Sequence, residues 1–506
     1  MITNLKALLV VLVMAMAVFY VAKPICLRFM AEIDFLRRRN VWFALTITAF
    51  VTPSFWLYAA VALPVMYWAA RRDENPVALY VLLLHVIPPV SIQVPAIIVN
   101  QLFDLSNYRI LAFAVLVPVA WQLMFAKDKT AFGRHKGIDR YLWAYFALQL
   151  ILLMPYEDIT NTLRRGFLIA LDCIVLVYVV SRVCNTRERL AEVLAAFCLA
   201  CAIMVPLALF ESQKVWQLYS GLAYVWNIPI EIYLFRDGAL RAQVSTGHAL
   251  GLGFMLSIAF AFWLYVSSQI PKAFQRLSGA LGYWLGLIAA LSRAPWISAA
   301  LAYVVYTLLS PRGFKNLAKA ALVAVPVTAI VLVSPLGPQV IDKLPFIGKV
   351  DSGNVDYRER LAQSSWELIQ KNPLLGDPFF TKSLEHLRQG QGIIDLVNVY
   401  ASIAMLHGVV GLLLFLMPFL LAMWATWKQL MRVFGQHDDL SRMGASLLAA
   451  MLATAFFMVT GSFYGSLPMV FYLLVGLCSA YGNLKQPISD STSSGNERKR
   501  PRLMPQ

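Results

Sequence analysis

The segment Gly408–Trp427, GVVGLLLFLMPFLLAMWATW, contains twenty consecutive residues without a charged side chain. Twenty helical residues rise about 30 Å, which matches the hydrocarbon thickness of a bilayer. This segment therefore predicts a membrane-spanning helix. Similar apolar runs recur along the chain, for example at Leu190–Phe210 and Ala249–Val266. The fold is decided by helices of this kind.

The composition points to the same class of protein. Of 506 residues, 59% are hydrophobic and only 14% are charged, and the mean hydropathy is +0.66. Such a chain has too little polar surface for a soluble globular protein, so the sequence predicts an all-α polytopic membrane protein. The formal net charge is +16. Because the basic excess lies in short connections beside apolar runs, we interpret it as an orientation signal and as contact with membrane lipids, not as nucleic-acid binding.

The apolar runs predict roughly 13 to 15 spanning helices. The number depends on Val41–Ala70, where Thr52–Ser54 either breaks one helix or separates two short ones, because proline disrupts a helix interior. The expected organisation is N-terminal helices of open topology at 1–75, a helical core at 76–333 with an outer loop at 211–248, a large outer loop at 334–396, C-terminal helices at 397–482, and a disordered basic cytoplasmic tail at 483–506.

Clusters of Lys and Arg indicate the orientation. Counting helices between clusters such as Arg71–Arg72 and Arg182–Arg189 puts them on one side of the membrane, which identifies that side as cytoplasmic. Arg37–Arg39 do not fit a single span through Val41–Ala70, because that span would place them outside. The topology of the N-terminal helices stays open at this point.

The segment 334–396 is long for a connection and is not of low complexity, so we expect it to fold as a cap on the outer face. It carries an apolar stripe with helical spacing, interrupted by charged residues, which predicts an amphipathic helix. The stripe consists of Tyr357, Leu361, Trp366, Leu368 and Ile369.

No P-loop, dinucleotide-binding glycine pattern or Asp-x-Asp pair occurs in the sequence, so any chemistry is expected in the outer loops. Arginines in these loops suit a lipid-linked phosphate or diphosphate, because a guanidinium group binds phosphate oxygens in bidentate fashion. Arg293 lies between two spanning segments, where a charge is expensive without a function or a partner. The other outer arginines are Arg236, Arg241, Arg358 and Arg360; solvation, or pairing with Asp237, Glu359 or Asp356, explains Arg236, Arg358 and Arg360 equally simply.

Several other polar residues are candidates with simpler explanations. Asp172 lies within an apolar run, where it is either functional or the buried partner of a cation on a neighbouring helix. His85 and His407 fit hydrogen-bonded core positions, whereas His248 and His386 lie at the outer boundary and in the large loop. Cys198 and Cys201 form a C-x-x-C inside an apolar helix, where packing is the simpler reading, and no metal-ligand spacing occurs.

Three stretches together resemble the bacterial O-antigen ligase/polymerase family of integral-membrane glycosyltransferases. Arg241–Phe254, RAQVSTGHALGLGF, is similar to the family's segment that leads from a periplasmic loop into a helix. Ser292–Trp296, SRAPW, is similar to its Ser-Arg-Gly-x-Trp corner. Tyr357–Gly411, containing RERLAQSSWELIQKNPLLGDP and NVYASIAMLHGVVG, resembles the large periplasmic loop and the helix after it. The resemblance covers about 238–415.

One position departs from the family pattern. Family ligases carry His-Asn-x-Tyr-Leu where the loop ends, and here Asn398 and Tyr400 are in register but Val397 replaces the histidine. The departure favours a polymerase-like member over a ligase.

The resemblance implies a GT-C-like helical fold in the bacterial inner membrane, with an active site that faces the periplasm. It implies polymerisation of undecaprenyl-diphosphate-linked repeat units into a cell-surface polysaccharide or exopolysaccharide, without metal or cofactor. Implied partners are the lipid-linked glycan donor and acceptor, a polysaccharide flippase and a chain-length regulator. Transfer of the glycan to lipid A core or protein is the alternative, followed by a polysaccharide or lipid transporter and a non-catalytic scaffold for polysaccharide export.

The resemblance also assigns roles. Arg241, Arg293 and Arg358 match family arginines, and the first two are expected to stabilise the diphosphate leaving group. An arginine cannot accept the proton of the acceptor hydroxyl, so a base must come from elsewhere. Asp395 ranks first because it lies two residues before Val397. The remaining candidates for the base are His386, His248 and Glu359, and further substrate-binding candidates are Arg360, Trp366, Asn398 and Tyr400.

Overall fold

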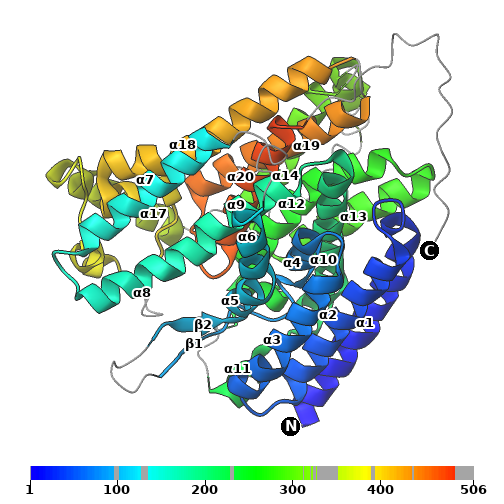
Figure 1. The fold of residues 1–506 in the computed structure, drawn as a ribbon, viewed down its shortest axis with the longest axis horizontal. Coiled ribbons are helices and arrows are strands. Elements are labelled where there is room, and N and C mark those ends of the chain that lie inside the picture. Colours follow the sequence, from blue (N-terminus) through cyan, green and yellow to red (C-terminus); the bar gives the residue numbers. More distant parts are fainter. Residues whose placement is uncertain are drawn as a thin grey trace.

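The computed structural model describes residues 2–95, 102–126, 135–227, 233–236, 238–310, 313–319, 321–322, 326, 352–388, 394–435 and 438–484. The described chain is nearly all helical (Figure 1). Its first part contains α1 (Ile2–Cys26), α2 (Glu32–Val51), α3 (Phe55–Arg72), α4 (Pro76–Leu83), α5 (Asn107–Leu111), the π-helical turn η1 (Ala112–Leu116), α6 (Val117–Met124), α7 (Lys136–Leu153), α8 (Ile159–Ile169), the π-helical turn η3 (Ala170–Val175) and α9 (Leu176–Val183).

The second part contains the long helix α10 (Arg187–Lys214) and, after it, α11 (Ser220–Trp226), the short 3₁₀ helix η4 (Val244–Thr246), α12 (Ala249–Ser268), α13 (Ala273–Ala289), α14 (Arg293–Leu308), α17 (Ser352–Lys371), the 3₁₀ helix η5 (Phe380–Leu387), α18 (Val399–Val433), α19 (Asp438–Thr460) and α20 (Leu467–Gly482). Two antiparallel ribbons also occur in the described chain. They pair β1 (Ser91–Gln93) with β2 (Asp104–Ser106), and β3 (Phe235–Arg236) with β4 (Ala239–Leu240).

Seven helical segments of the described residues are long and apolar enough to cross a membrane. This confirms the predicted all-α membrane architecture, whereas the predicted number of 13 to 15 crossings is not confirmed. The seven segments are Thr3–Cys26, Asn107–Met124, Ile159–Val183, Arg187–Lys214, Ala249–Ser268, Val399–Val433 and Asp438–Thr460; Leu467–Gly482 is a shorter apolar helix.

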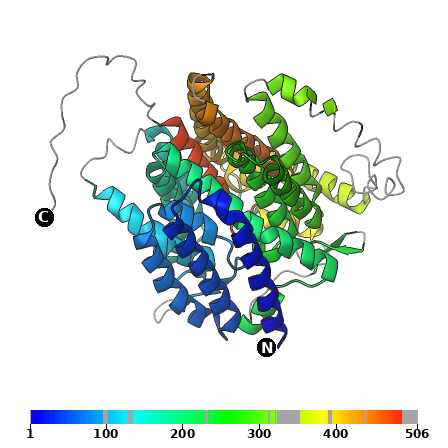
Figure 2. The ribbon, with the colours of Figure 1, turned by 90° about the vertical axis from the view of Figure 1, so that its right-hand side faces the viewer.

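The N-terminal helices α1, α2 and α3 pack side by side (Figure 1, Figure 2). Helix α2 ends at Val51 and α3 begins at Phe55, so Thr52–Ser54 separates two helices. Arg38 of α2 is 1% exposed and binds Asp73, just after α3, with Nε to Oδ2 at 2.8 Å. Its Nη2 also lies 2.8 Å from Oε1 of Glu192 in α10. The cluster Arg37–Arg39 therefore lies at the same end of the bundle as Arg71–Arg72.

The helix connections lie at two ends of the helix bundle, which we call the basic end and the loop end. At the basic end, Arg28 donates to the carbonyl of Gln269 (3.2 Å), and Arg187 pairs with Asp439. This end carries the clusters that the sequence predicts to be cytoplasmic. At the loop end, Asn4 donates to the carbonyl of Gly221 (3.3 Å), and Trp226 Nε1 donates to the carbonyl of Thr52 (3.1 Å).

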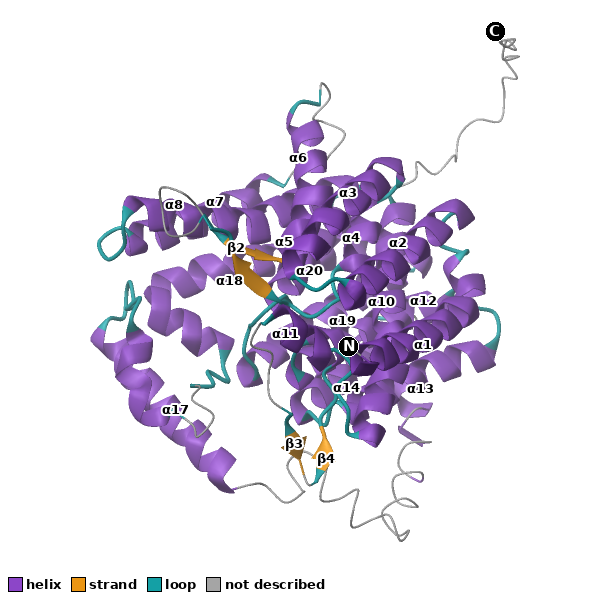
Figure 3. Cartoon of the chain, turned by 90° about the horizontal axis from the view of Figure 1, so that it is seen from below, coloured by secondary structure: helices purple, strands orange, loops and turns teal. Residues whose placement is uncertain are grey.

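The described part of the large loop, 352–388 and 394–396, shares a small core with the start of α18. Helix α17 lies at the margin of the bundle, as Figure 3 shows, and packs on η5 and on the start of α18. Trp366 does not follow the other residues of the predicted apolar stripe. It is 61% exposed, whereas Tyr357 and Leu361 are buried against η5. The buried residues of this small core are Tyr357, Leu361, Phe380, Leu384, Leu387 and Met405.

The turn that follows α17 is built into α18. Gly408 interrupts α18 with a φ of 65° and a ψ of −171°. Two amides beyond the break are bonded by the turn: Val409 N donates to the carbonyl of Pro373 (2.8 Å), and Val410 N donates to that of Leu374 (3.3 Å). The Pro-Leu-x-Gly turn that the sequence contains thus replaces the helix's own hydrogen bonds.

Candidate functional site

The β3–β4 ribbon places two arginines at the C-terminal end of α13. Arg236 Nη1 donates to the carbonyl of Leu291 at 2.7 Å, and Arg241 Nε lies 3.5 Å from that of Ala290. The backbone amide of Ala242 donates to the carbonyl of Ala289 at 3.0 Å. Carbonyl groups at a helix C-terminus carry partial negative charge, which favours arginine there. The local chain therefore fixes both arginines at the loop end, beside the corner that leads to Arg293.

Arg293 is the first residue of α14 and is half-buried. It follows Leu291, whose φ of 45° reverses the chain between α13 and α14. Because Arg236 binds the carbonyl of Leu291, the structure brings the corner and the ribbon together. The predicted diphosphate-binding arginines thus come from adjoining segments.

The segment after Arg241 is held by a buried acid that the sequence reasoning missed. Glu211, at the end of α10, is fully buried, and its Oε2 accepts from the amides of Gln243 (3.1 Å) and Val244 (2.9 Å). Its Oε1 accepts from the amide of Leu218 at 2.9 Å. The available signal was an acidic residue at the boundary of an apolar run, where a buried acid and a solvated one look alike.

His248 caps the N-terminus of α12. Its Nδ1 accepts from the amide of Leu250 at 3.0 Å and is also bonded to the hydroxyl of Tyr464. Burial, and after it the positive charge of Arg241, lower the pKa of His248 to about 3. The imidazole is therefore neutral, and a neutral ring that accepts at Nδ1 carries its proton on Nε2.

The connection 461–466 between α19 and α20 makes hydrogen bonds to several polar residues that the sequence singled out. Ser462 lies 3.0 Å from Oδ1 of Asp395 and 2.8 Å from the carbonyl of Leu396. Tyr464 bonds to His248 as described above. Ser466 lies 2.8 Å from Nε2 of His85. Sequence analysis did not select these hydroxyls, because a short polar stretch between two apolar runs is an ordinary helix connection.

A groove of about 310 Å³ runs between α17 and the start of α18. Arg358, Trp366 and Asn398 line it together with Val397, the residue at the family's histidine position. The side chain of Asn398 caps α18 by accepting from the amide of Ala401 at 3.0 Å. One wall is fixed to Asp395, because Tyr357 of α17 donates to the Asp395 carbonyl at 3.0 Å. Apolar side chains make up most of the lining, and Arg358, Asn398 and two serines, Ser365 and Ser402, are its polar groups.

Other predicted site residues lie apart from this groove. Glu359 and Arg360 are exposed on α17, and Arg360 Nε donates to the carbonyl of Asp356 at 3.3 Å. His386 is exposed on η5, with its Nε2 3.2 Å from the hydroxyl of Ser364. Tyr400 donates to the carbonyl of Ala455 at 3.0 Å and thereby anchors α18 on α19. None of the four is among the groove-lining residues that the structure describes.

The polar residues inside the bundle have structural partners. Arg109 Nη2 lies 2.8 Å from Oδ2 of Asp172, so the buried-partner reading of Asp172 is confirmed. His407 Nδ1 lies 3.1 Å from the hydroxyl of Tyr145. Cys198 and Cys201 donate to backbone carbonyls of α12, as packed thiols do. Within the described ranges, the structure contains no group of three or more His, Cys, Asp or Glu side chains that could hold a metal ion.

Comparison with known protein families gives a match over part of the chain. A family model described as O-Antigen ligase matches residues 277–416. The matched range contains the Arg293 corner, α17, the Gly408 break and the groove-lining residues except Val459, while Arg241 and His248 lie before it. The match confirms the predicted resemblance to the O-antigen ligase/polymerase family. No curated protein matches the chain.

Proposed function

We propose that this chain, which carries the O-antigen ligase match over 277–416, polymerises undecaprenyl-diphosphate-linked oligosaccharide repeat units into a cell-surface polysaccharide or exopolysaccharide. The match supports ligase/polymerase-type chemistry in general. The observation that carries the site is the connection 461–466, which bonds both to His248 beside Arg241 and to Asp395 beside the groove. One short segment thereby contacts His248, which lies beside the proposed diphosphate-binding residue Arg241, and Asp395, the proposed base for the acceptor hydroxyl.

The proposed reaction forms one bond and breaks one. The oxygen of an acceptor sugar hydroxyl attacks the anomeric carbon of the donor glycan, and the bond from that carbon to the diphosphate oxygen breaks. The diphosphate leaves with the electron pair. The hydroxyl proton passes to Asp395, which directly precedes the groove-lining residues Leu396 and Val397 and whose carboxylate is oriented by Ser462.

Positive charge stabilises the leaving diphosphate. Arg241 and Arg293 supply it from adjoining segments, and Arg241 Nε lies 3.5 Å from the carbonyl of Ala290 at the end of α13. The sequence suggested His248 as a candidate for the base, but its protonation in the structure favours another role. With a pKa of about 3 and a proton on Nε2, it is suited to donate a hydrogen bond and unsuited to accept a proton there.

The remaining substrate contacts follow from the groove. Arg358, Trp366 and Asn398 are proposed to bind the growing chain, since an indole ring offers a stacking surface and the polar groups offer hydrogen bonds. We also propose that the loop end faces the periplasm and the basic end the cytoplasm of a bacterial inner membrane. A flippase and a chain-length regulator complete the proposed set of partners.

Transfer of the glycan to lipid A core or protein is the second candidate. The description of the matching family, O-Antigen ligase, favours it. Val397 opposes it, because the groove has an aliphatic side chain where family ligases carry histidine.

The test is reconstitution of the purified protein in nanodiscs with the lipid-linked repeat unit, followed by separation of products by size. A ladder of products is expected for wild type, and its loss in Arg241→Gln and in Arg293→Gln. Arg165→Gln is the control, because this arginine pairs with Glu157, has a side chain that is 53% exposed and belongs to no proposed substrate contact.

Other outcomes decide between the candidates. Consumption of donor only when lipid A core or a protein acceptor is present would establish a ligase. An unchanged ladder in both arginine variants would refute the assignment of the diphosphate site, and the absence of turnover with every acceptor would favour a transporter or a scaffold.

A further inference from the structure

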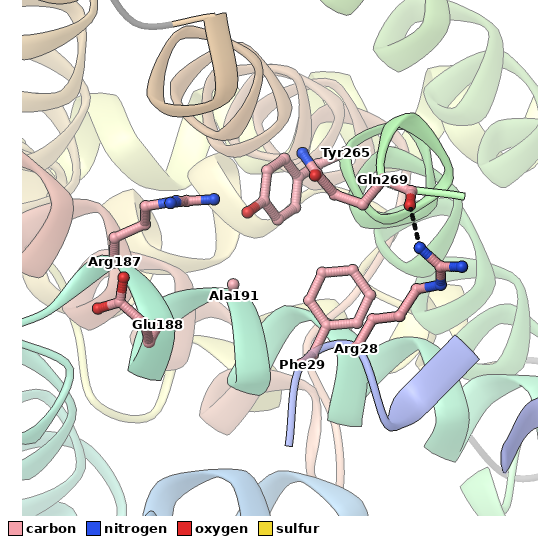
Figure 4. A pocket seen from close by; sticks show the side chains of 7 residues that line it. All are labelled: Arg28, Phe29, Arg187, Glu188, Ala191, Tyr265 and Gln269. Carbon is pink, nitrogen blue, oxygen red and sulfur yellow. Dashed lines mark hydrogen bonds between the residues drawn. The ribbon is translucent and has the colours of Figure 1, made fainter. Parts of the chain in front are cut away.

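The basic end contains a cavity of about 400 Å³ that the proposed reaction does not use. Figure 4 shows that Arg28 and Arg187 lie on opposite sides of it, with the rings of Phe29 and Tyr265 between them. The two rings lie 6.4 Å apart, centroid to centroid. Glu188, Ala191 and Gln269 complete the lining.

The two arginines differ in their partners. Arg187 pairs with Asp439, whereas Arg28 donates one hydrogen bond, to the carbonyl of Gln269, and makes no ion pair with any described residue. A guanidinium group has five N–H donors, so most of those on Arg28 remain available. An uncompensated guanidinium beside a cavity suits a phosphate group. Glu188 and Asp439 limit the site to a ligand with little negative charge, such as a phosphodiester.

The cavity lies at the level of lipid headgroups. Arg28 follows the candidate span Thr3–Cys26 by two residues, Arg187 begins the span Arg187–Lys214, and Gln269 directly follows the span Ala249–Ser268. Three spans that end together at one cavity place it at the boundary of the hydrocarbon region. Soluble phosphate has no reason to prefer this level, whereas the headgroup of a phospholipid occupies it.

An exposed apolar row begins beside the cavity. Helix α13 starts four residues after Gln269, and large apolar side chains lie exposed along one of its faces. They are Phe274, Leu277, Leu281, Leu285 and Ile288, between 38% and 81% exposed. Such a row suits the acyl chains of a lipid whose headgroup enters the cavity.

We infer that this cavity binds the phosphodiester headgroup of an anionic phospholipid, with Arg28 as its main ligand and with the acyl chains along α13. The aromatic rings of Phe29 and Tyr265 enclose the glycerol portion. The site ties together α1, α10 and α12 at the basic end, so binding stabilises the bundle.

The experiment measures the thermal unfolding of delipidated protein in detergent while short-chain phosphatidylglycerol is added. The expected result is a rise in Tm for wild type and for Arg71→Gln, an exposed arginine at the same end. Arg28→Gln is expected to weaken the response about tenfold in lipid concentration, and Arg28→Lys to restore part of it. Far-UV circular dichroism of each variant without lipid confirms that it is folded.

Two further ligands separate the possible sources of phosphate. Short-chain phosphatidylcholine tests the need for a net negative charge, and glycerol phosphate tests the need for acyl chains; neither is expected to raise Tm. An equal response of wild type and Arg28→Gln to phosphatidylglycerol would overturn the site, and an equal effect of glycerol phosphate would reassign it to a soluble phosphate compound.

Discussion

The hydroxyl of Tyr464 bonds to Nδ1 of His248 across 216 residues of sequence. The two rings also meet at nearly right angles, with centroids 4.6 Å apart and an interplanar angle of 67°. Together with the amide of Leu250, Tyr464 fixes the imidazole by its Nδ1 side. The orientation of His248 therefore depends on the connection between α19 and α20.

Removing that hydroxyl is expected to impair the proposed reaction. In Tyr464→Phe the aromatic contact remains but one hydrogen bond to His248 is lost, which corresponds to about 1 kcal/mol and to a roughly fivefold decrease in turnover. Product formation in nanodiscs measures the effect. Tyr224→Phe is the control, because Tyr224 is 90% exposed on α11. Full activity of Tyr464→Phe would show that the orientation of His248 is unimportant for transfer.

The stability of the protein should depend on pH through His248. In the folded protein, burial and Arg241 lower the pKa of His248 from 6.5 to about 3. Between these values the unfolded chain binds a proton that the folded protein does not, so the free energy of unfolding falls as the pH decreases from 6.5 toward 3. The limiting slope for one proton is about 1.4 kcal/mol per pH unit. His248→Gln should flatten this slope in denaturant unfolding, whereas His386→Gln, at an exposed ring, should retain it.

The break in α18 is expected to tolerate no side chain. A Cβ at Gly408 would lie 2.2 Å from the carbonyl carbon and oxygen of Leu374, and its φ of 65° is unfavourable for alanine. Gly408→Ala should therefore destabilise the protein by about 3 kcal/mol or more. Gly282→Ala is the matched control, because a Cβ there meets nothing within 4 Å in α13, and alanine favours a helix. Thermal unfolding of both variants checks the prediction; a neutral Gly408→Ala would contradict the docking of the turn.

We expect the buried ion pair Arg109–Asp172 to support the stability of the protein only when both partners are present. Their side chains are only 12% and 10% exposed. Arg109→Gln leaves a buried carboxylate without its partner and is expected to cost about 3 kcal/mol. The double variant Arg109→Gln, Asp172→Asn should be more stable than this single variant. Arg165→Gln, which removes an exposed pair with Glu157, should cost less than about 1 kcal/mol.

The helices could be predicted from sequence because hydropathy is a local property. The position of Arg37–Arg39 could not, since it depends on the partners of Arg38, which are Asp73 just after α3 and Glu192 in α10. The outer arginines stood out as charges beside apolar runs, and the structure brings Arg236 and Arg241 to the α13 end beside Arg293. Ser462, Tyr464 and Glu211 did not stand out. Their roles arise from long-range packing, which gives an ordinary hydroxyl or carboxyl group a specific partner.

The hydrogen bonds that close the Gly408 break also limit how the protein can be engineered. Residues 352–388 and the helix Val399–Val433 share backbone hydrogen bonds, so they form one transplantable block and not two. A hybrid with a loop from one relative and a helix from another would put the hydrogen bonds to the amides of Val409 and Val410 at risk, and a buried amide without a partner costs free energy. Redesign of the proposed glycan contacts is therefore best made by substituting groove side chains, or by exchanging 352–433 as a whole.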